Sequence, residues 1–306
     1  MPKNPYIAVI SNPAAGQRSG PFLWGVINRL KKKGAKVDLI VTEAPGHAVK
    51  LAADLSTEGS VDLIVAAGGD GTLREVAEGL NGSDVPLGII PAGTANVMAR
   101  ELGYMKKGIK SVKRVSKILL KNRTRPVYPF QLTHEGKRTI GLCWLGAGFD
   151  AAVLQYVNPW MKSKIGRAAF APAMITTMIK EPRKPSVPWQ SSDVTGMAGW
   201  IILANIAKYA GPFVLTEKTA VDQRGLAWLR FKKAGAIARL VDQILLPFKS
   251  LDVRGETQEL LSEQVIIGDG NTPIQLDGDL IGFGPVSIQP QEKPIMFKAG
   301  KVNLRS

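Results

Sequence analysis

The chain has 306 residues, of which 45% are hydrophobic and 21% carry a charge, so a mainly disordered protein is excluded and two domains are predicted. The formal charge of +15 at pH 7 favours anionic partners, such as nucleic acid, anionic lipid headgroups or phosphorylated ligands. The only cysteine, Cys143, excludes an internal disulfide, and the sequence has no Cys/His cluster with the spacing of a zinc site.

The first part of the chain alternates short apolar runs with amphipathic patterns, which predicts a parallel α/β sheet. Strands are expected at 6–10, 37–41, 61–67 and 86–90. Helices are expected at 22–33, 46–55, 73–80, 94–102 and 109–121. Strand 61–67 is apolar enough to be buried on both faces.

The pattern changes near 124–126, and the rest of the chain is predicted to be rich in strands. The expected strands are 127–132, 138–145, 200–206, 226–231, 264–267, 274–276, 286–289 and 295–297. A helix is expected at 163–179, with Met174, Ile175 and Met178 in the core. The proline-rich segment 180–188 is expected to form a loop.

A glycine-rich segment, Gly68-Gly69-Asp70-Gly71-Thr72, connects strand 61–67 to the following helix. Such a turn directs backbone N–H groups and a helix N-terminus toward one point, which suits a phosphate. The glycines let the backbone approach a ligand without a Cβ in the way. Thr72 and Glu75 also have the spacing of a capping box, but a cap needs no glycines around an aspartate. Phosphate binding is therefore favoured.

Two other loops are expected beside this one. Residues 91–96 (Pro-Ala-Gly-Thr-Ala-Asn) follow strand 86–90, and residues 11–16 (Ser-Asn-Pro-Ala-Ala-Gly) follow the first strand. Thr94 can cap the next helix, bind phosphate, or do both. Since the carboxyl ends of parallel strands meet at one edge of a sheet, the three loops are predicted to form one ligand site there. No Walker A sequence occurs in the chain.

These motifs, in this order, resemble those of the diacylglycerol kinase catalytic domain, a family that includes bacterial lipid kinases and sphingosine and ceramide kinases. The likeness continues at Gly146–Ala151 and at 276–279 (Leu-Asp-Gly-Asp), the latter similar to the family's late Asp-Gly-Glu. The resemblance implies a phosphofructokinase/NAD-kinase-like N-terminal parallel-sheet domain and a C-terminal β-sandwich domain. It places the nucleotide-binding α/β domain at 1–126, with 291–306 returning to it, and the lipid-substrate domain at 127–290. The active site would lie between the two domains.

The resemblance also implies an ATP- and Mg²⁺-dependent lipid kinase that transfers the γ-phosphate to a lipid hydroxyl, such as that of diacylglycerol. The residues that match ATP-binding positions are Asn12, Thr42, Gly68, Gly69, Asp70, Gly71, Thr72, Leu73, Arg74, Gly93 and Thr94. Asp70 is expected to act through Mg²⁺ or by orienting the phosphates. The late acidic motif is expected to supply the general base, so Asp277 and Asp279 are both candidates. Asp-Gly between apolar runs is also a hairpin signal.

Two departures from the family pattern bear on the site. Asp279 stands where the family usually has Glu, and Ala15 stands where it often has Ser. The segment 219–226 matches only loosely a region that holds a structural metal in some members. Asp222 is its one matching acid, and a turn residue in solvent is the simpler interpretation.

The expected partner is a lipid substrate at an anionic membrane surface. No run of 18 apolar residues occurs and the N-terminus lacks a signal peptide, so we expect a cytoplasmic protein, peripheral at the inner face of the membrane. Membrane contact is predicted for a set of aromatic and basic residues: Trp160, Lys162, Lys164, Arg167 and Trp189. A homodimer stays open.

Three other functions compete with this interpretation. An NAD kinase-like enzyme would explain the Gly68–Thr72 segment but not residues 91–96. A non-catalytic lipid- or nucleotide-binding regulator would keep the fold but not the turnover, and the late acidic pair argues against it. A nucleic-acid partner is not expected, because the basic residues are scattered and belong to no recognised nucleic-acid motif.

Overall fold

The computed structural model describes most of the chain. The described residues are 4–13, 20–106, 109–158, 161, 170–180, 186–192, 194–209, 213–214, 216, 219–231, 256–261 and 263–301. The chain divides into two compact units. The N-terminal unit comprises Met1–Val127 and Lys293–Ser306, and the β-rich unit comprises Tyr128–Glu292.

The N-terminal unit contains a six-stranded sheet with the order β2-β1-β3-β4-β20-β5. Its strands are β1 (Tyr6–Ser11), β2 (Lys36–Val41), β3 (Leu63–Gly68), β4 (Leu87–Pro91), β5 (Thr124–Val127) and β20 (Ile295–Lys298). Strands β2, β1, β3 and β4 are mutually parallel. β3 and β4 are buried along their whole length, as expected for central parallel strands covered on both faces.

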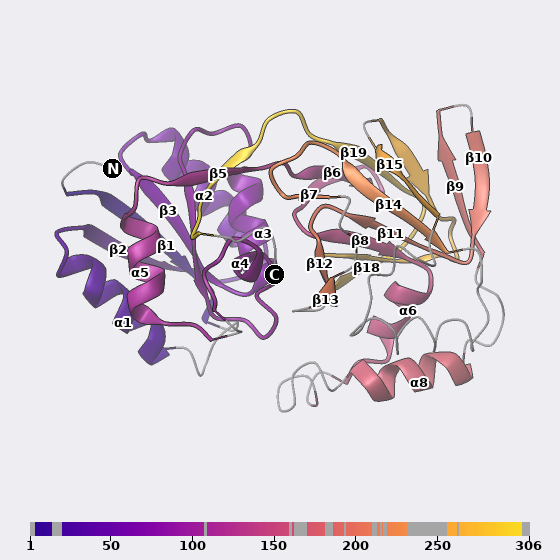
Figure 1. The fold of residues 1–306 in the computed structure, drawn as a ribbon, viewed down its shortest axis with the longest axis horizontal. Helices are drawn as coiled ribbons and strands as arrows, with labels where there is room; N and C mark the ends of the chain where they lie inside the picture. The colour runs from indigo at the N-terminus through magenta and orange to yellow at the C-terminus, as the bar shows by residue number, and fades with distance from the viewer. Residues whose placement is uncertain are drawn as a thin grey trace. The chain divides into compact units, whose positions relative to one another are not determined.

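Helices cover both faces of this sheet (Figure 1). They are α1 (Gly20–Lys31), α2 (His47–Thr57), α3 (Asp70–Gly79), α4 (Val97–Glu101) and α5 (Val112–Leu120). α1 packs against α5, and α2 packs against α3. The strand order reverses direction after β2, so right-handed crossovers place α1 on one face and α2 and α3 on the other. The point of reversal lies at β1 and β3, where ligands of such sheets bind.

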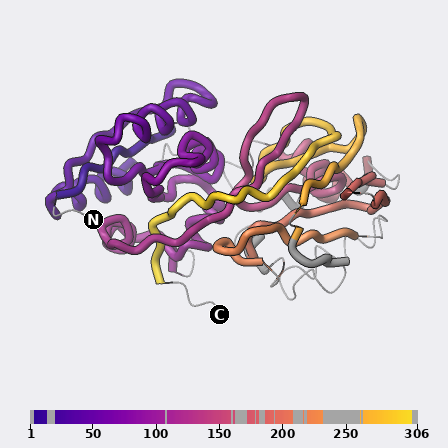
Figure 2. The backbone as a smooth tube through the Cα atoms, turned by 90° about the horizontal axis from the view of Figure 1, so that it is seen from above, coloured from indigo at the N-terminus to yellow at the C-terminus, as the bar shows by residue number. Residues whose placement is uncertain are grey.

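The far edge of the sheet is completed from the other end of the sequence. β20 runs antiparallel to β5, and the two segments lie side by side in Figure 2. β20 pairs with β4 only at Phe297 and Leu87. Further along β4, the N–H of Ile89 donates instead to the hydroxyl of the buried Tyr104, at 3.3 Å. Burial raises the pKa of Tyr104, so its hydroxyl stays protonated.

The β-rich unit contains two antiparallel six-stranded sheets. One has the order β10-β9-β16-β19-β6-β7: β10 (Val194–Ala198), β9 (Val187–Ser191), β16 (Val265–Ile267), β19 (Val286–Pro290), β6 (Phe130–His134) and β7 (Lys137–Gly141). The other has the order β15-β14-β11-β8-β17-β18: β15 (Glu256–Leu261), β14 (Leu226–Phe231), β11 (Trp200–Ala204), β8 (Trp144–Ala147), β17 (Pro273–Leu276) and β18 (Asp279–Phe283). A two-stranded pair is formed by β12 (Lys208–Tyr209) and β13 (Phe213–Val214).

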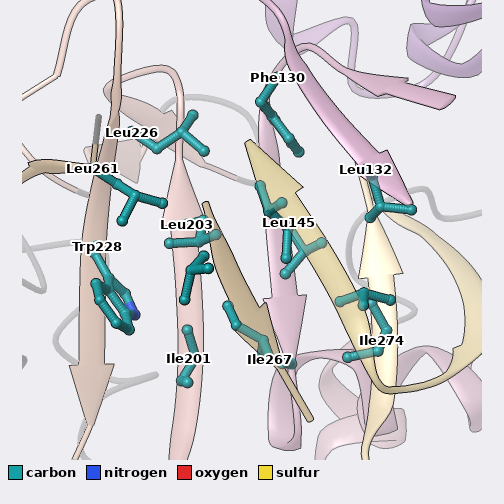
Figure 3. Close-up of a cluster of buried hydrophobic side chains, with 14 of the residues drawn as sticks. Phe130, Leu132, Leu145, Ile201, Leu203, Leu226, Trp228, Leu261, Ile267 and Ile274 are labelled. Carbon is teal, nitrogen blue, oxygen red and sulfur yellow. The ribbon is translucent and has the colours of Figure 1, made fainter. Parts of the chain in front are cut away.

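Alternate residues of the two sheets meet in one hydrophobic core (Figure 3). Phe130 and Leu132 of β6 face Leu145 of β8, and Ile201 and Leu203 of β11 continue the same layer. The period-two spacing of these residues along each strand is what a sheet buried on one face requires. The unit is therefore a β-sandwich, accompanied by α6 (Phe149–Gln155) and α8 (Phe170–Lys180).

The predicted fold class is confirmed: a parallel α/β sheet is followed by antiparallel sheets. Two predicted strands were wrong. Residues 127–132 contain the end of β5, which belongs to the N-terminal sheet, and the start of β6, which belongs to the sandwich. Residues 138–145 form two strands, β7 and β8, which belong to different sheets of the sandwich. The chain crosses from one sheet to the other at Leu142 and Cys143. An apolar run gives no sign of such a crossing, because both sheets bury the same kind of side chain.

Several observed helix and loop boundaries differ from the predicted ones. The helix expected at 94–102 is the short α4, and the one expected at 163–179 is observed as α8, with 162–169 outside the described residues. The loop expected at 180–188 ends earlier, because β9 begins at Val187. Among the described residues, no helix is long and apolar enough to cross a membrane.

The Tyr104 hydroxyl gives a test of how β4 is held. Tyr104→Phe should lower the free energy of unfolding by about 1–3 kcal/mol, because the buried Ile89 N–H then lacks its acceptor. Urea denaturation measures this. Tyr6→Phe is the control, since the Tyr6 hydroxyl bonds Asp38 on the exposed surface and its loss should cost less than about 1 kcal/mol. Equal losses in the two variants would contradict the role given to Tyr104.

Candidate active site

The three predicted loops meet at the carboxyl edge of the N-terminal sheet. Ser11 pairs with Ala67, and Gly68 pairs with Pro91, so β1, β3 and β4 end side by side. A pocket of about 200 Å³ lies at this edge. It is lined by Ser11, Asn12, Pro13, Gly20, Phe22, Leu23, Leu39, Val41, Ala67, Ile90 and Ala92.

The second and third loops touch through their glycines. The carbonyl of Gly68 accepts the N–H groups of Ala92 (2.9 Å) and Gly93 (3.2 Å). A Cβ on Gly93 would come within 2.5 Å of the Cα of Gly69, which is closer than real contacts allow. Glycine at 93 is thus required for the two loops to approach. The N–H of Gly93 already donates to the Gly68 carbonyl, so it is not a donor for a ligand. The role of Gly93 is to allow the close approach, because it has no side chain.

Helix α3 begins directly in the glycine-rich segment. Its N-cap is Gly69, with no side-chain cap, so the capping box predicted as an alternative for Thr72 and Glu75 is wrong. The first turn leaves its backbone N–H groups without acceptors inside the helix, and here these groups belong to Asp70, Gly71 and Thr72. A phosphate at this turn also gains from the helix dipole. The N–H of Leu73 donates to Gly69 and its side chain is buried, so Leu73 offers no atom to a ligand.

Polar side chains join the first loop to this turn. The Nδ2 of Asn12 donates to Oγ1 of Thr72 at 3.3 Å, and the side chain of Thr72 is buried. A Cβ on Gly68 would overlap the Thr72 side chain. The N–H of Thr42, which follows β2, donates to the carbonyl of Ser11 at 2.9 Å. The structure therefore brings Asn12 and Thr72 together, as predicted from the loop order, and places Thr42, which the family resemblance implied, beside Ser11.

The third loop is closed by Asn96 rather than by Thr94. Asn96 has a positive φ of 48°, accepts the N–H of Gly93 at 2.9 Å and donates to its carbonyl at 2.6 Å. Asn96 is the N-cap position of α4, so the cap predicted for Thr94 is wrong. Thr94 is exposed, which leaves its hydroxyl accessible to a ligand. Oδ1 of Asp70 accepts the N–H of Met98 at 3.3 Å and so connects the second loop to the third.

The pocket beside these loops is mainly apolar, and its polar end is at Asn12. Phe22 and Ile90 are among its apolar lining residues. Lys110 lies against Phe22, with Nζ 4.8 Å from the ring centroid and 3.5 Å from the carbonyl oxygen of Pro91. Burial lowers the pKa of the Lys110 ammonium. Sequence reasoning missed Phe22 and Lys110, because neither belongs to a motif. Arg74, which was predicted to bind ATP, lies on α3, and its side chain is half-buried.

In the β-rich unit, Asp277 and Gly278 form the two-residue turn between β17 and β18. Both have positive φ, 52° and 92°, as in a type I′ hairpin, so the hairpin signal was read correctly. Asp277 is only 8% exposed. Its carboxylate accepts three backbone N–H groups at 2.8–3.0 Å, from Leu142, Cys143 and Trp144. These residues are the crossing between the two sheets.

The two candidate bases thus have different environments. Because the Asp277 carboxylate is buried and holds three N–H donors, its geometry argues against a role as proton acceptor. Asp279 is the first residue of β18 and is exposed. The turn directs Asp279 outward while Asp277 faces the sheet crossing. Leu280, the next residue, is a large hydrophobic side chain that is also exposed.

The remaining site predictions concern a metal ligand, Asp222, and the residues expected to contact a membrane. Asp222 is half-buried, and no three His, Cys, Asp or Glu side chains within the described ranges lie close enough to hold a metal, so a metal site there gains no support. Trp189 packs edge-on against Trp228, with ring centroids 4.9 Å apart, and the Arg230 guanidinium lies 4.5 Å from its ring. This packing against the sandwich core argues against membrane contact by Trp189. Trp160, Lys162, Lys164 and Arg167 lie outside the described residues.

Part of the chain is similar to known sequences. Residues 6–131 match the family model of the diacylglycerol kinase catalytic domain. YtlR of Bacillus subtilis is 34% identical over 154 residues, which cover 49% of this chain and 48% of YtlR. The diacylglycerol kinase of Mycobacterium tuberculosis is 38% identical over 106 residues, 34% of each chain. Sphingosine kinase B of Dictyostelium discoideum is 34% identical over 110 residues, 33% of this chain and 14% of that protein. The chain thus matches about half, or less, of the length of these relatives.

Solved structures extend the likeness of fold to nearly the whole chain. A structure from Bacillus anthracis superposes with a TM-score of 0.76 at 21% identity and covers 98% of this chain and 97% of that one. A diacylglycerol kinase structure from the same organism gives a TM-score of 0.69 at 19% identity, with 98% of both chains covered.

The three glycine-containing loops all lie within the part of the chain that matches this family model. Residues 6–131 thus resemble the diacylglycerol kinase catalytic domain, and the chain is similar in sequence to bacterial lipid kinases and to a sphingosine kinase.

The Asp277 carboxylate predicts a large effect on stability. In Asp277→Asn, one acceptor oxygen becomes an NH₂ group that faces backbone donors, so we expect a loss of roughly 2–5 kcal/mol of unfolding free energy. Denaturant unfolding followed by tryptophan fluorescence measures it. Asp269→Asn is the control. Asp269 accepts hydrogen bonds in an exposed turn, so this substitution should lower the free energy of unfolding far less. A stability equal to that of the unmodified chain would exclude the structural role of Asp277.

Proposed function

We propose that this protein is an ATP- and Mg²⁺-dependent lipid kinase that phosphorylates a lipid hydroxyl, with diacylglycerol as the first candidate acceptor. The observation that carries the proposal is the contact of the Gly68–Thr72 and 91–96 loops at Gly69 and Gly93. The contact leaves no room for a Cβ at position 93. It presents the first turn of α3 next to an apolar pocket, which suits a triphosphate joined to a flat base.

On the donor side, the chain supplies several groups toward a nucleotide. The backbone N–H groups of Gly71 and Thr72 bind phosphate oxygens, and the accessible hydroxyl of Thr94 adds a donor from the neighbouring loop. The apolar side chains of the pocket, such as Phe22 and Ile90, pack against the base. Asn12 keeps Thr72 in place. The Asp70 carboxylate is the acid suited to hold Mg²⁺, which when bound neutralises charge on the phosphates.

On the acceptor side, Asp279 serves as general base. The lipid hydroxyl oxygen forms a bond to the γ-phosphorus, and the bond from that phosphorus to the bridging oxygen of ADP breaks. The proton of the hydroxyl passes to the Asp279 carboxylate. Asp277 fixes the turn and takes no proton. Aspartate is one methylene shorter than the Glu usual in the family, so the acceptor hydroxyl must come closer to the backbone of β18.

The activity test uses labelled ATP, Mg²⁺ and a panel of lipids that offer different hydroxyls: diacylglycerol, a sphingoid base, phosphatidylglycerol and a prenol. We expect one labelled lipid product. Asp279→Asn should lower kcat by about 10²–10⁴-fold, as loss of a general base does. Asp70→Ala should lower it by roughly 10²–10³-fold through weaker stabilisation of charge.

Two exposed acids provide matched controls. Glu135 occupies a hairpin turn in which both residues have positive φ, as in Asp277–Gly278, and Asp84 lies on the surface of the N-terminal unit. Glu135→Gln and Asp84→Asn should keep full activity. Absence of any labelled lipid, or full activity of both Asp70→Ala and Asp279→Asn, would refute the kinase proposal. Lipid and ATP binding without turnover would indicate a regulator instead.

We further propose that α8 contacts an anionic membrane surface. Its exposed Pro172, Ile175 and Ile179 follow a three- and four-residue spacing and so form one stripe, while Ala173 and Thr177 are buried. Ile175 is 58% and Ile179 72% exposed, so the expectation that Ile175 is a core residue was wrong. The helix ends at the exposed Lys180, and the sequence on both sides of it is basic. Apolar residues flanked by basic ones suit the interface of an anionic bilayer.

The membrane contact is tested with vesicles of phosphatidylcholine and phosphatidylglycerol. The double variant Ile175→Glu/Ile179→Glu should reduce vesicle binding at least about tenfold, because apolar burial is replaced by charge repulsion. Reversal of Lys162, Lys164 and Arg167 to Glu should weaken binding and its dependence on salt. Met197→Glu, which changes an exposed apolar residue of β10, is the control. Unchanged sedimentation of both test variants with vesicles would rule out the contact.

A further inference from the structure

A chain of hydrogen bonds lies beneath the Asp277–Gly278 turn. The amide Nε2 of Gln275 donates to Oδ2 of Asp150 at 2.7 Å, and its Oε1 accepts the N–H of Gly278 at 2.8 Å. Gln275 is 1% exposed and Asp150 is 9% exposed. Both ends of the Gln275 amide are therefore engaged, and its orientation is fixed by its two partners.

This chain of bonds is built into the fold. Gln275 lies on β17 between Ile274 and Leu276, which face the sandwich core, so its own side chain points to the other face of the sheet. Asp150 lies in the first turn of α6, which packs against β17. Gly146 of β8 pairs with Gln275. A Cβ on Gly146 would overlap Oδ2 of Asp150 and come within 2.7 Å of Nε2 of Gln275.

The turn is thus held from two directions. On one side, the Asp277 carboxylate accepts the three N–H groups of the sheet crossing. On the other side, the Gln275 amide holds the N–H of Gly278, with Asp150 behind it. The next residue is Asp279. The comparable turn at Glu135–Gly136 also has positive φ at both residues but is exposed, so such a turn does not by itself need buried polar groups.

A buried carboxylate and a buried amide cost free energy unless they are hydrogen-bonded, and here the bonds of Gln275 to Asp150 and to the N–H of Gly278 supply that compensation at the turn. A catalytic group must be held within about 0.5 Å of its working geometry. We propose that Asp150 and Gln275 are positioning residues that fix the Asp277–Gly278 turn and thereby aim the carboxylate of Asp279 at the acceptor hydroxyl. This rests on the proposed role of Asp279 as general base. Neither residue touches the substrate; both act through the turn.

The test is a double-mutant cycle between Gln275→Ala and Asp279→Asn, measured as lipid phosphorylation by the full chain. Gln275→Ala alone should lower kcat by roughly 10–100-fold, as a misplacement of about 1 Å does, with KM for ATP unchanged. In the Asp279→Asn background the same substitution should cost less than about twofold, because there is no base left to aim. Gln264→Ala removes an exposed glutamine that bonds Ser287 on the other sheet, and it should leave kcat unchanged.

A second pair of variants separates positioning from folding. Asp150→Asn keeps an oxygen that can accept from Gln275, so it should retain most activity, whereas Asp150→Ala should match Gln275→Ala. Amide hydrogen exchange in the peptide that contains Gly278 should quicken in Gln275→Ala and stay slow in Asp150→Asn.

The outcomes separate the two proposals. Equal kcat losses from Gln275→Ala with and without Asp279, or unchanged exchange at Gly278, overturn the positioning role and leave the base in place. Full activity of Asp279→Asn overturns the assignment of the base, and the positioning role with it. An equal loss in Asp150→Asn and Asp150→Ala overturns the hydrogen-bonding argument for Asp150.

Discussion

The site of this protein depends on one close approach, that of the backbones at Gly69 and Gly93. Parallel pairing ends β3 and β4 at the same edge of the sheet, and the Gly68 carbonyl joins their loops through the N–H groups of Ala92 and Gly93. Any side chain at position 93 would push the loops apart. The first turn of α3, the buried Thr72 and the apolar pocket all take their places from this contact.

In the β-rich unit, one residue of a hairpin turn, Asp277, has two structural roles. Asp277 has a positive φ because the type I′ turn requires it, and its carboxylate satisfies three N–H groups where the chain leaves one sheet for the other. A crossing between sheets interrupts both ladders, so its N–H groups need another acceptor. The same residue therefore serves the sandwich and presents its neighbour Asp279 at the surface.

Much of the fold and part of the site followed from sequence patterns, and the failures have physical causes. The alternation of strands and helices predicted the parallel sheet, because each period reflects local geometry. The crossing within 138–145 was not predicted, because the apolar residues 140–145 continue through it without a break. Ile175 was expected in the core, yet helical spacing is identical for a buried stripe and an exposed one. Thr72 and Glu75 have the spacing of a cap, but the helix begins two residues before Thr72.

The sequence by itself identified most of the residues to which we assign the proposed chemistry. The glycines of the loops, Asp70 and the late acids are recognisable, because their types and order follow from turn geometry and phosphate binding. Only the tertiary structure decided what each one does. It showed that Asp277 is occupied by backbone donors while Asp279 is exposed, that Asn96 closes its loop, and that Gln275 and Asp150 lie behind the turn. These assignments depend on contacts between residues far apart in the sequence, which no local pattern encodes.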